Sequence, residues 1–285
     1  MNEYDKYLKL LKEKYPTKQS VYRELINLNA IMNLPKGTEH FMSDLHGEYD
    51  AFYHIINNCS GVIREKVAML YGDELTVYEQ QELCTLIYYP REKLSILMDE
   101  NKVNDEWYRN VLDQLIQIAK LLSSKYTRSK VRKAMPVDFA YIIDELIHAQ
   151  KDEDDNRSVY HRQIMETILS LHNGDEFLVA LTDLIKRLAV DHLHILGDIY
   201  DRGPHADKIL DLLMEHHSVD IQWGNHDILW MGAFCGNPVC MALVVRNNIK
   251  YKTMSILENG YGISLRFLLQ FAVNTYSDKN VDDAV

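Results

Sequence analysis

Three short stretches of the chain carry residue types that could bind a metal ion and a phosphate. They read Asp-x-His-Gly at residues 44–47, Gly-Asp-x-x-Asp-Arg-Gly at residues 197–203 and Gly-Asn-His-Asp at residues 224–227. Each follows an apolar run that is typical of a short buried strand. Taken singly, the first and third stretches are also typical of a turn or a helix cap. The occurrence of all three in this order, each at the end of a strand, favours a metal site.

Four side chains in these stretches form a donor set for divalent cations. Asp44 and Asp198 supply carboxylates, His46 supplies an imidazole, and Asn225 supplies an amide oxygen. This mixture suits an ion of intermediate hardness, such as manganese or iron. Because a carboxylate can share its two oxygens, Asp198 is the candidate to bridge two ions. Two ions about 3.5–4 Å apart can clamp a phosphate and lower the pKa of a shared water towards about 7.

Three further side chains in the second and third stretches predict a phosphate-hydrolysing site. The guanidinium of Arg202 matches the paired oxygens of a phosphate. His226 can protonate the leaving oxygen if a partner fixes its tautomer, and Asp201 is a suitable partner. His205 is close enough to the second stretch to stay undecided. The remaining histidines near the strands are predicted to be structural: His192, His194, His216 and His217.

The elements that must position these loops alternate between strand and helix. Strands are predicted at residues 38–43, 192–196 and 219–223, and a helix at residues 49–58 follows the first strand. Such alternation predicts an α/β fold in which a parallel or mixed sheet has helices on both faces. Ligands bind beyond the carboxyl ends of the strands in these sheets, where all three polar stretches fall.

The periodicity of the sequence divides the chain into three segments. Residues 1–61 hold an N-terminal helix over residues 1–34 and the first βα unit with its Asp-x-His motif. Residues 62–172 show helical periodicity with few glycines and prolines, which predicts a helical insertion. Residues 173–285 resume the α/β pattern and carry the other two motifs.

The composition excludes several classes of protein. The chain has 285 residues, 47% of them hydrophobic, with a formal net charge of -11 and a pI of about 5.5. This negative charge argues against a general binder of nucleic acids or anionic membranes. The four cysteines form no Cys-x-x-Cys pair, the polar N-terminus shows no signal peptide, and no apolar run is long enough to cross a bilayer. These features predict a cytoplasmic protein with free thiols.

The three motifs in this order resemble those of the binuclear metallophosphoesterase, or calcineurin-like, superfamily. Residues 41–52, 88–94, 223–232 and 259–262 further resemble bacterial class III fructose-1,6-bisphosphatases. The resemblance spans nearly the whole chain. It implies a metallophosphoesterase-type sheet core with a large helical insertion between the first and second metal motifs.

The resemblance also implies an activity and a set of residue roles. The activity is hydrolysis of fructose 1,6-bisphosphate to fructose 6-phosphate and phosphate, a gluconeogenic step, with two divalent ions, Mn²⁺ foremost. The implied partner is a small sugar bisphosphate rather than a nucleic acid or a membrane, and a homo-oligomer is left open. By motif position, Asp44, His46, Asp198 and Asn225 are metal ligands, Arg202 is a phosphate contact, and Asp201 and His226 are an acid pair.

The histidine content departs from the superfamily pattern. The superfamily completes its second metal site with histidines downstream of the Asn-His pair, whereas His226 is the last histidine here. The remaining ligands are expected beyond residue 285, as in an N-terminal portion of a longer protein. We therefore expect the chain, as a folded monomer, to bind at most one divalent ion tightly and to have negligible bisphosphatase activity beside that of a longer chain. The alternatives are a protein or dinucleotide phosphatase of the same superfamily, and a catalytically incomplete metal-binding fragment.

Overall fold

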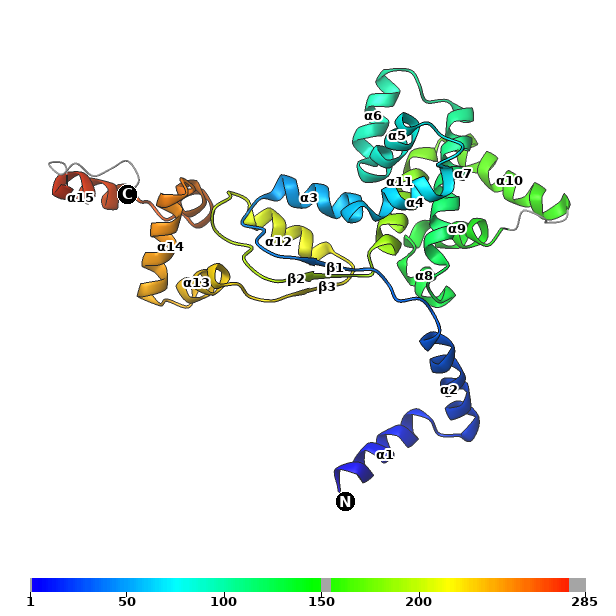
Figure 1. Cartoon of the computed structure of the whole chain (residues 1–285), viewed down its shortest axis with the longest axis horizontal. Helices are drawn as coiled ribbons and strands as arrows, with labels where there is room; N and C mark the ends of the chain where they lie inside the picture. The colour runs from blue at the N-terminus through cyan, green and yellow to red at the C-terminus, as the bar shows by residue number, and fades with distance from the viewer. Residues whose placement is uncertain (1, 150–154, 277–285) are drawn as a thin grey trace.

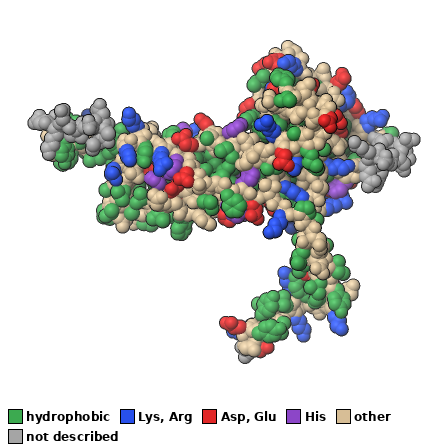
Figure 2. Space-filling model, viewed as in Figure 1, with side chains coloured by type: hydrophobic (Ala, Val, Ile, Leu, Met, Phe, Trp, Pro, Cys, Tyr) green, Lys and Arg blue, Asp and Glu red, His purple; other side chains and the backbone are tan. Residues whose placement is uncertain are grey.

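The chain begins with two helices that form an arm. The computed structural model describes residues 2–149 and 155–276. Helices α1 (Glu3–Lys14) and α2 (Lys18–Met32) bury no residue and extend away from the other elements, with apolar side chains on their surface (Figures 1 and 2). The expectation of one helix over residues 1–34 is wrong, because Pro16 cannot continue a helix. Thr17 then caps α2 by accepting the N–H of Ser20 at 3.1 Å.

A helical body follows the first strand and its helix. Its core is formed mainly by helices α7 (Asp105–Ser123) and α11 (Gly174–Ala189). The two helices pack against each other, and the apolar side chains between them are buried. The apolar residues at helical spacing from Leu112 to Leu122 are buried in this core, in agreement with the helical periodicity of residues 62–172. The elements of the body are η1 (Cys59–Gly61), α4 (Val62–Tyr71), α5 (Val77–Tyr88), α6 (Pro90–Asp99), α7 (Asp105–Ser123), α8 (Arg128–Ala134), η2 (Val137–Phe139), α9 (Ala140–Ile147), α10 (Asp155–Ser170) and α11 (Gly174–Ala189).

The segment boundary at residues 172 and 173 stays a prediction. Helix α11 falls in the third predicted segment, yet its buried side chains belong to the core of the helical body. The sequence pattern alone separates α11 from the body because the helix directly precedes a strand, as in a βα unit.

A small parallel sheet carries the three polar loops. Its strands β1 (Glu39–Met42), β2 (His192–Ile195) and β3 (Val219–Ile221) lie side by side in this order (Figure 1). Phe41 of β1 pairs with His194 of β2, and His194 pairs with Asp220 of β3. The strands are shorter than predicted, but they run parallel and end at the same edge, as the α/β pattern requires.

Helices cover one face of this sheet and leave the other partly exposed. Leu193 and Ile195 of β2 are buried against α3 (Tyr49–Asn58) and α12 (Ala206–Glu215). On the opposite face, Phe41 is 62% exposed and His194 is partly exposed. The prediction of helices on both faces is therefore met on one face only in the described part of the chain. The reason is the alternation of polar and apolar residues in β2, which is typical of a strand with one apolar face.

The third motif leads into a compact group of C-terminal helices. Helices α13 (Asn225–Phe234) and α14 (Pro238–Lys250) pack together, and η3 (Ile256–Gly260) and α15 (Arg266–Tyr276) follow them. Trp230, Val244 and Leu257 are buried where α13, α14 and η3 meet. Within the described ranges, none of the helices has the length and apolar character needed to cross a membrane.

Candidate metal centre

Backbone hydrogen bonds join the loops after β1 and β2. The N–H groups of His46 and Gly47 donate to the carbonyls of Asp198 and Ile199 at 2.8 Å each, and the N–H of Gly203 donates to the carbonyl of His46 at 2.7 Å. A side-chain carbon on either Gly47 or Gly203 would overlap the backbone of the opposing loop. Both loops therefore approach closely because each has a glycine at the crossing.

This crossing brings three of the four predicted metal ligands together. One ligand atom each from Asp44, His46 and Asp198 lies within 4.8 Å of the other two. All three residues have positive φ angles, of 56°, 46° and 57°. Such angles are uncommon for residues with side chains, although aspartate and histidine adopt them more readily than most. The loops hold this backbone conformation while turning the side chains towards one point.

The hydrogen bonds of His46 support a metal site. Its Nδ1 lies 3.1 Å from the carbonyl oxygen of Tyr200, so Nδ1 carries the proton and donates it. The other ring nitrogen, Nε2, is buried, has no hydrogen-bond partner in the structure, and lies 3.6 Å from a carboxylate oxygen of Asp44. An unprotonated imidazole nitrogen held in this way by its other nitrogen is a typical metal ligand. The donor set therefore fits a divalent cation.

Asn225 is placed next to this cluster as the first residue of α13. Its side chain is exposed. The following residue, His226, donates its backbone N–H to Oδ1 of Asp198 at 3.1 Å, which ties the start of α13 to the candidate metal ligands. The role of Asn225 as a fourth ligand stays a prediction.

The buried Asp201 and the half-buried His226 form a pair beside the cluster. Nδ1 of His226 lies 2.7 Å from Oδ2 of Asp201, and the ring of His226 meets that of His46 edge-on at 5.2 Å between centroids. Asp201 is 3% exposed and also accepts hydrogen bonds from Nε1 of Trp230 and Nδ2 of Asn247, each at 2.8 Å. With three donors, its carboxylate is held in one orientation, and it fixes the proton of His226 on Nδ1.

The sequence reasoning missed both of these supporting residues. Trp230 falls within the stretch at residues 223–232 that resembles the family, and this resemblance could have indicated a role for it. Asn247 is on α14 and is 46 positions from Asp201. No local pattern predicts such a distant contact.

Asp227 is a third residue whose role the sequence reasoning missed. Its carboxylate, 5% exposed, accepts backbone N–H groups from Asp198, Ile199, Tyr200 and Gly224 at 2.7–3.1 Å. It therefore holds the loop after β2 against the start of α13. The motif Gly-Asn-His-Asp could have indicated this, because an aspartate in the first turn of a helix commonly accepts backbone N–H groups.

Replacing Asp227 with alanine is expected to lower the free energy of unfolding by at least about 3 kcal/mol, because four buried or half-buried N–H groups would lose their acceptor. Urea unfolding would measure this. Asp211→Ala, at an exposed aspartate of α12, is the control and should change stability by less than about 0.5 kcal/mol. Equal stability of the two variants would contradict the structural role of Asp227.

Arg202 and His205 belong to the loop after β2 and its continuation into α12. Arg202 is exposed at a φ of 74°, and no carboxylate in the described residues pairs with its guanidinium. His205 borders a cavity of about 620 Å³ next to Asp201, which is also lined by Tyr200, Trp230 and Tyr261. Rings of these three aromatic residues lie against one another, at 4.9 and 5.7 Å between successive centroids. The cavity is large enough for a small ligand.

The two histidines after α12 make hydrogen bonds to backbone carbonyl oxygens. Nδ1 of His216 lies 3.0 Å from the carbonyl oxygen of Ser218, and Nε2 of His217 lies 2.9 Å from that of Val190. Burial, reinforced by the neighbouring His217, lowers the pKa of His216 to about 4. A neutral, hydrogen-bonded imidazole of this kind is consistent with the predicted structural role.

The fold and the site together define a class of protein. It is a parallel α/β protein whose strand-end loops gather carboxylate and imidazole donors for a divalent cation beside a hydrogen-bonded Asp–His pair. The chain belongs to the firmicute fructose-1,6-bisphosphatase family, whose family model matches residues 6–284. The resemblance read from the motifs is thus confirmed.

Curated relatives cover nearly all of this chain but are much longer. The class 3 fructose-1,6-bisphosphatase 1 of Clostridium beijerinckii is 55% identical over 273 residues, which are 96% of this chain and 41% of the relative. The class 3 enzymes of Listeria monocytogenes serotype 4b and Clostridium acetobutylicum are 55% and 53% identical over 96% of this chain, and 42% and 41% of their own lengths are covered. The chain therefore spans about two fifths of these relatives. No solved structure matches it.

Proposed function

We propose that this chain carries part of the active site of a metal-dependent phosphomonoesterase that hydrolyses fructose 1,6-bisphosphate to fructose 6-phosphate and phosphate. The observation that carries the proposal is the convergence of Asp44, His46 and Asp198 beside the Asp201–His226 pair. The names of relatives 53–55% identical to the chain support the substrate. The geometry supports phosphate chemistry but does not select the sugar.

In this proposal, the metal ligands are Asp44, His46 and Asp198, with Asn225 as a fourth. A divalent ion, which we propose to be Mn²⁺, would neutralise phosphate charge and acidify a water molecule when bound. Mn²⁺ is consistent with ligands that are mostly oxygens together with one imidazole. A second ion would need ligands in addition to these four.

The other residues bind the phosphate and supply a proton. The guanidinium of Arg202, with which no carboxylate in the described residues pairs, would hold two phosphate oxygens. As water attacks phosphorus, the bond from phosphorus to the sugar oxygen breaks, and Nε2 of protonated His226 gives its proton to that oxygen. Asp201 would keep the other proton on Nδ1 and stabilise the imidazolium charge. Trp230 and Asn247 keep Asp201 in place through their hydrogen bonds.

A phosphate-release assay with Mn²⁺ tests the substrate. Fructose 1,6-bisphosphate is compared with a phosphopeptide and a diadenosine polyphosphate, using both this chain and the Clostridium beijerinckii relative. We expect the relative to prefer the sugar bisphosphate and this chain to show negligible turnover beside it, because the loop site has four candidate ligands in the described part of the chain and a second ion there would need more. Preference for the phosphopeptide or the dinucleotide would refute the proposed substrate.

Arg202→Ala is expected to raise KM for the sugar bisphosphate by roughly 10- to 100-fold in any longer chain that carries this sequence and is active. Hydrogen bonds to charged groups contribute about 1.5–3 kcal/mol each. Metal content should stay unchanged, because Arg202 is not among the metal ligands. Steady-state kinetics and elemental analysis measure the two effects, and loss of metal from the variant would show that Arg202 acts on the loop rather than on phosphate.

The four cysteines are free thiols in the structure. We propose the cytoplasm as the location, because free thiols persist in a reducing compartment.

A further inference from the structure

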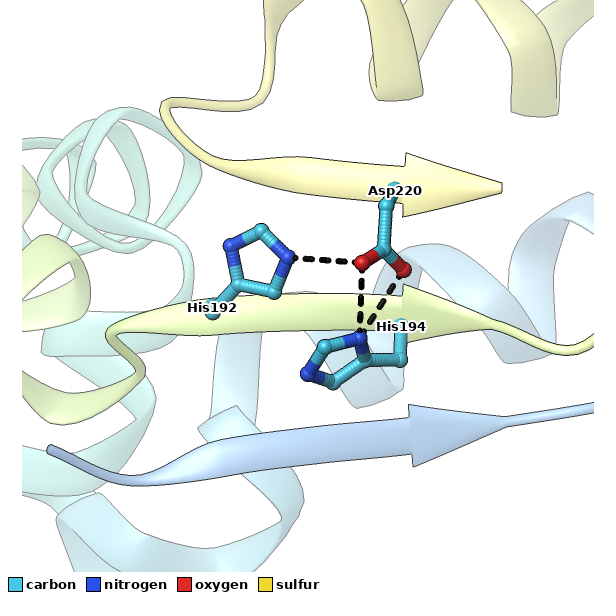
Figure 3. A group of neighbouring side chains, drawn as sticks. All are labelled: His192, His194 and Asp220. Atoms are coloured by element: carbon cyan, nitrogen blue, oxygen red, sulfur yellow. Dashed lines mark hydrogen bonds and ion pairs between the residues drawn. The ribbon is translucent and has the colours of Figure 1, made fainter. Parts of the chain in front are cut away.

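A second group of potential metal ligands lies on the exposed face of the sheet. His192 and His194 are two positions apart on β2 and therefore point to the same side of the sheet. Asp220 on β3 is the register partner of His194. Figure 3 shows both imidazoles of β2 turned towards the carboxylate of Asp220 on the neighbouring strand β3. One ligand atom of each residue lies within 4.8 Å of the other two.

We propose that His192, His194 and Asp220 form a binding site for a zinc-like divalent cation, separate from the loop site. Nε2 of His192 is 3.2 Å from Oδ2 of Asp220, and Nδ1 of His194 is 2.9 and 3.0 Å from its two oxygens. Ligands about 2.0–2.2 Å from a tetrahedral zinc ion lie roughly 3.3 Å from one another. The separations of both imidazoles from the carboxylate are therefore close to those that zinc requires, and the two imidazole nitrogens lie within 4.8 Å of each other.

The position of the proton on the ring of His194 favours a bound cation. If Nδ1 of His194 donates to Asp220, then Nε2 has no proton. That nitrogen is buried without a hydrogen-bond partner, and its nearby charged group is the Glu39 carboxylate at 3.9 Å, which can only accept. A cation on Nδ1 moves the proton to Nε2, where it faces the carboxylate of Glu39. Metal binding would thus turn an N–H, instead of a lone pair, towards the Glu39 carboxylate and replace a repulsion between two acceptors with an attraction.

Neighbouring side chains also orient both imidazoles. Nδ1 of His192 is 2.6 Å from the hydroxyl oxygen of Ser218, which leaves Nε2 for the cation. The ring of Phe41 stacks on the ring of His194, with centroids 4.4 Å apart and an interplanar angle of 14°. Support of ligating histidines by such partners is usual at metal sites. Two imidazoles and one carboxylate leave room for a water as fourth ligand, and this donor set is typical of zinc.

The test uses the 285-residue chain with the loop site removed by Asp44→Asn and Asp198→Asn. Calorimetric titration with Zn²⁺ and visible absorption with Co²⁺ report on the remaining site. We expect about one bound ion, Co²⁺ bands of low coordination number, and a melting temperature that rises with Zn²⁺ concentration. Adding Asp220→Asn should abolish these signals, and adding Ser218→Ala should weaken binding by about 10-fold or more.

The control in the same background is His54→Gln, at an exposed histidine outside both clusters, and it should bind as tightly as the parent. Circular dichroism without metal establishes that each variant is folded. Absence of Zn²⁺ binding to the folded double variant would overturn the proposal. Binding that survives Asp220→Asn unchanged would also overturn it.

Discussion

Replacing Asp198 with asparagine should remove most of the divalent metal from the loop site and lower phosphate release at least about 100-fold. Changes to residues that only support a ligand already cost about 10- to 100-fold in metal affinity or activity, and Asp198 is a direct candidate ligand between the two loops. Asparagine adopts a positive φ readily, so the backbone at 57° is retained. Elemental analysis after dialysis measures metal in this chain, and phosphate release is measured in an active longer chain.

Asp138→Asn, at an exposed aspartate of η2, is the control and should retain both metal and activity. Circular dichroism distinguishes loss of the ion from loss of the fold. Retention of metal and near-normal turnover by Asp198→Asn would show that this carboxylate is no ligand.

His226→Ala should lower kcat by about 10²- to 10⁴-fold for the sugar bisphosphate, the usual contribution of a positioned general acid. The loss should be much smaller for a nitrophenyl phosphate, because a good leaving group needs no proton. Metal content should change little, since the hydrogen bond from residue 226 to Asp198 comes from the backbone. Rates for substrates with a series of leaving groups measure the effect in an active longer chain.

Two further measurements test whether His226→Ala loses activity because a general acid is missing. Added imidazole should restore part of the activity of His226→Ala, because the space beside Asp201 would accept the missing ring. Arg202→Ala should slow all leaving groups to a similar extent. If the two variants respond identically to the leaving group, His226 is not the acid.

The sequence predicted the elements nearest the site well because their patterns are local. The predicted helix at residues 49–58 has the bounds of α3, and the three strands are found at the predicted places with fewer residues. The structure also brings Asp44, His46 and Asp198 together and pairs Asp201 with His226. Because parallel strands end at one edge of the sheet, the positions of the strand ends alone predict that these side chains lie close together.

The missed features depend on contacts that no local pattern encodes. The carboxylate of Asp227 reaches backbone groups that are 27–29 positions away, and Asn247 approaches Asp201 only because α14 packs on α13. The exposed sheet face was misjudged for a different reason. Alternation of strands and helices predicts a layered fold, but only the polar positions of β2 indicate that one face is left without a helix from the described residues.

The separation of the two loops along the chain has a consequence for folding. His46 and Tyr200 are in hydrogen-bond contact although 154 positions separate them, and the helical body fills most of that interval. Contacts between neighbouring helices form faster than pairing of distant strands. A folded body would shorten the effective loop that β1 and β2 must close, and so reduce its entropic cost. The order of assembly would then run from helices to sheet to cation site, with cation uptake marking the final step.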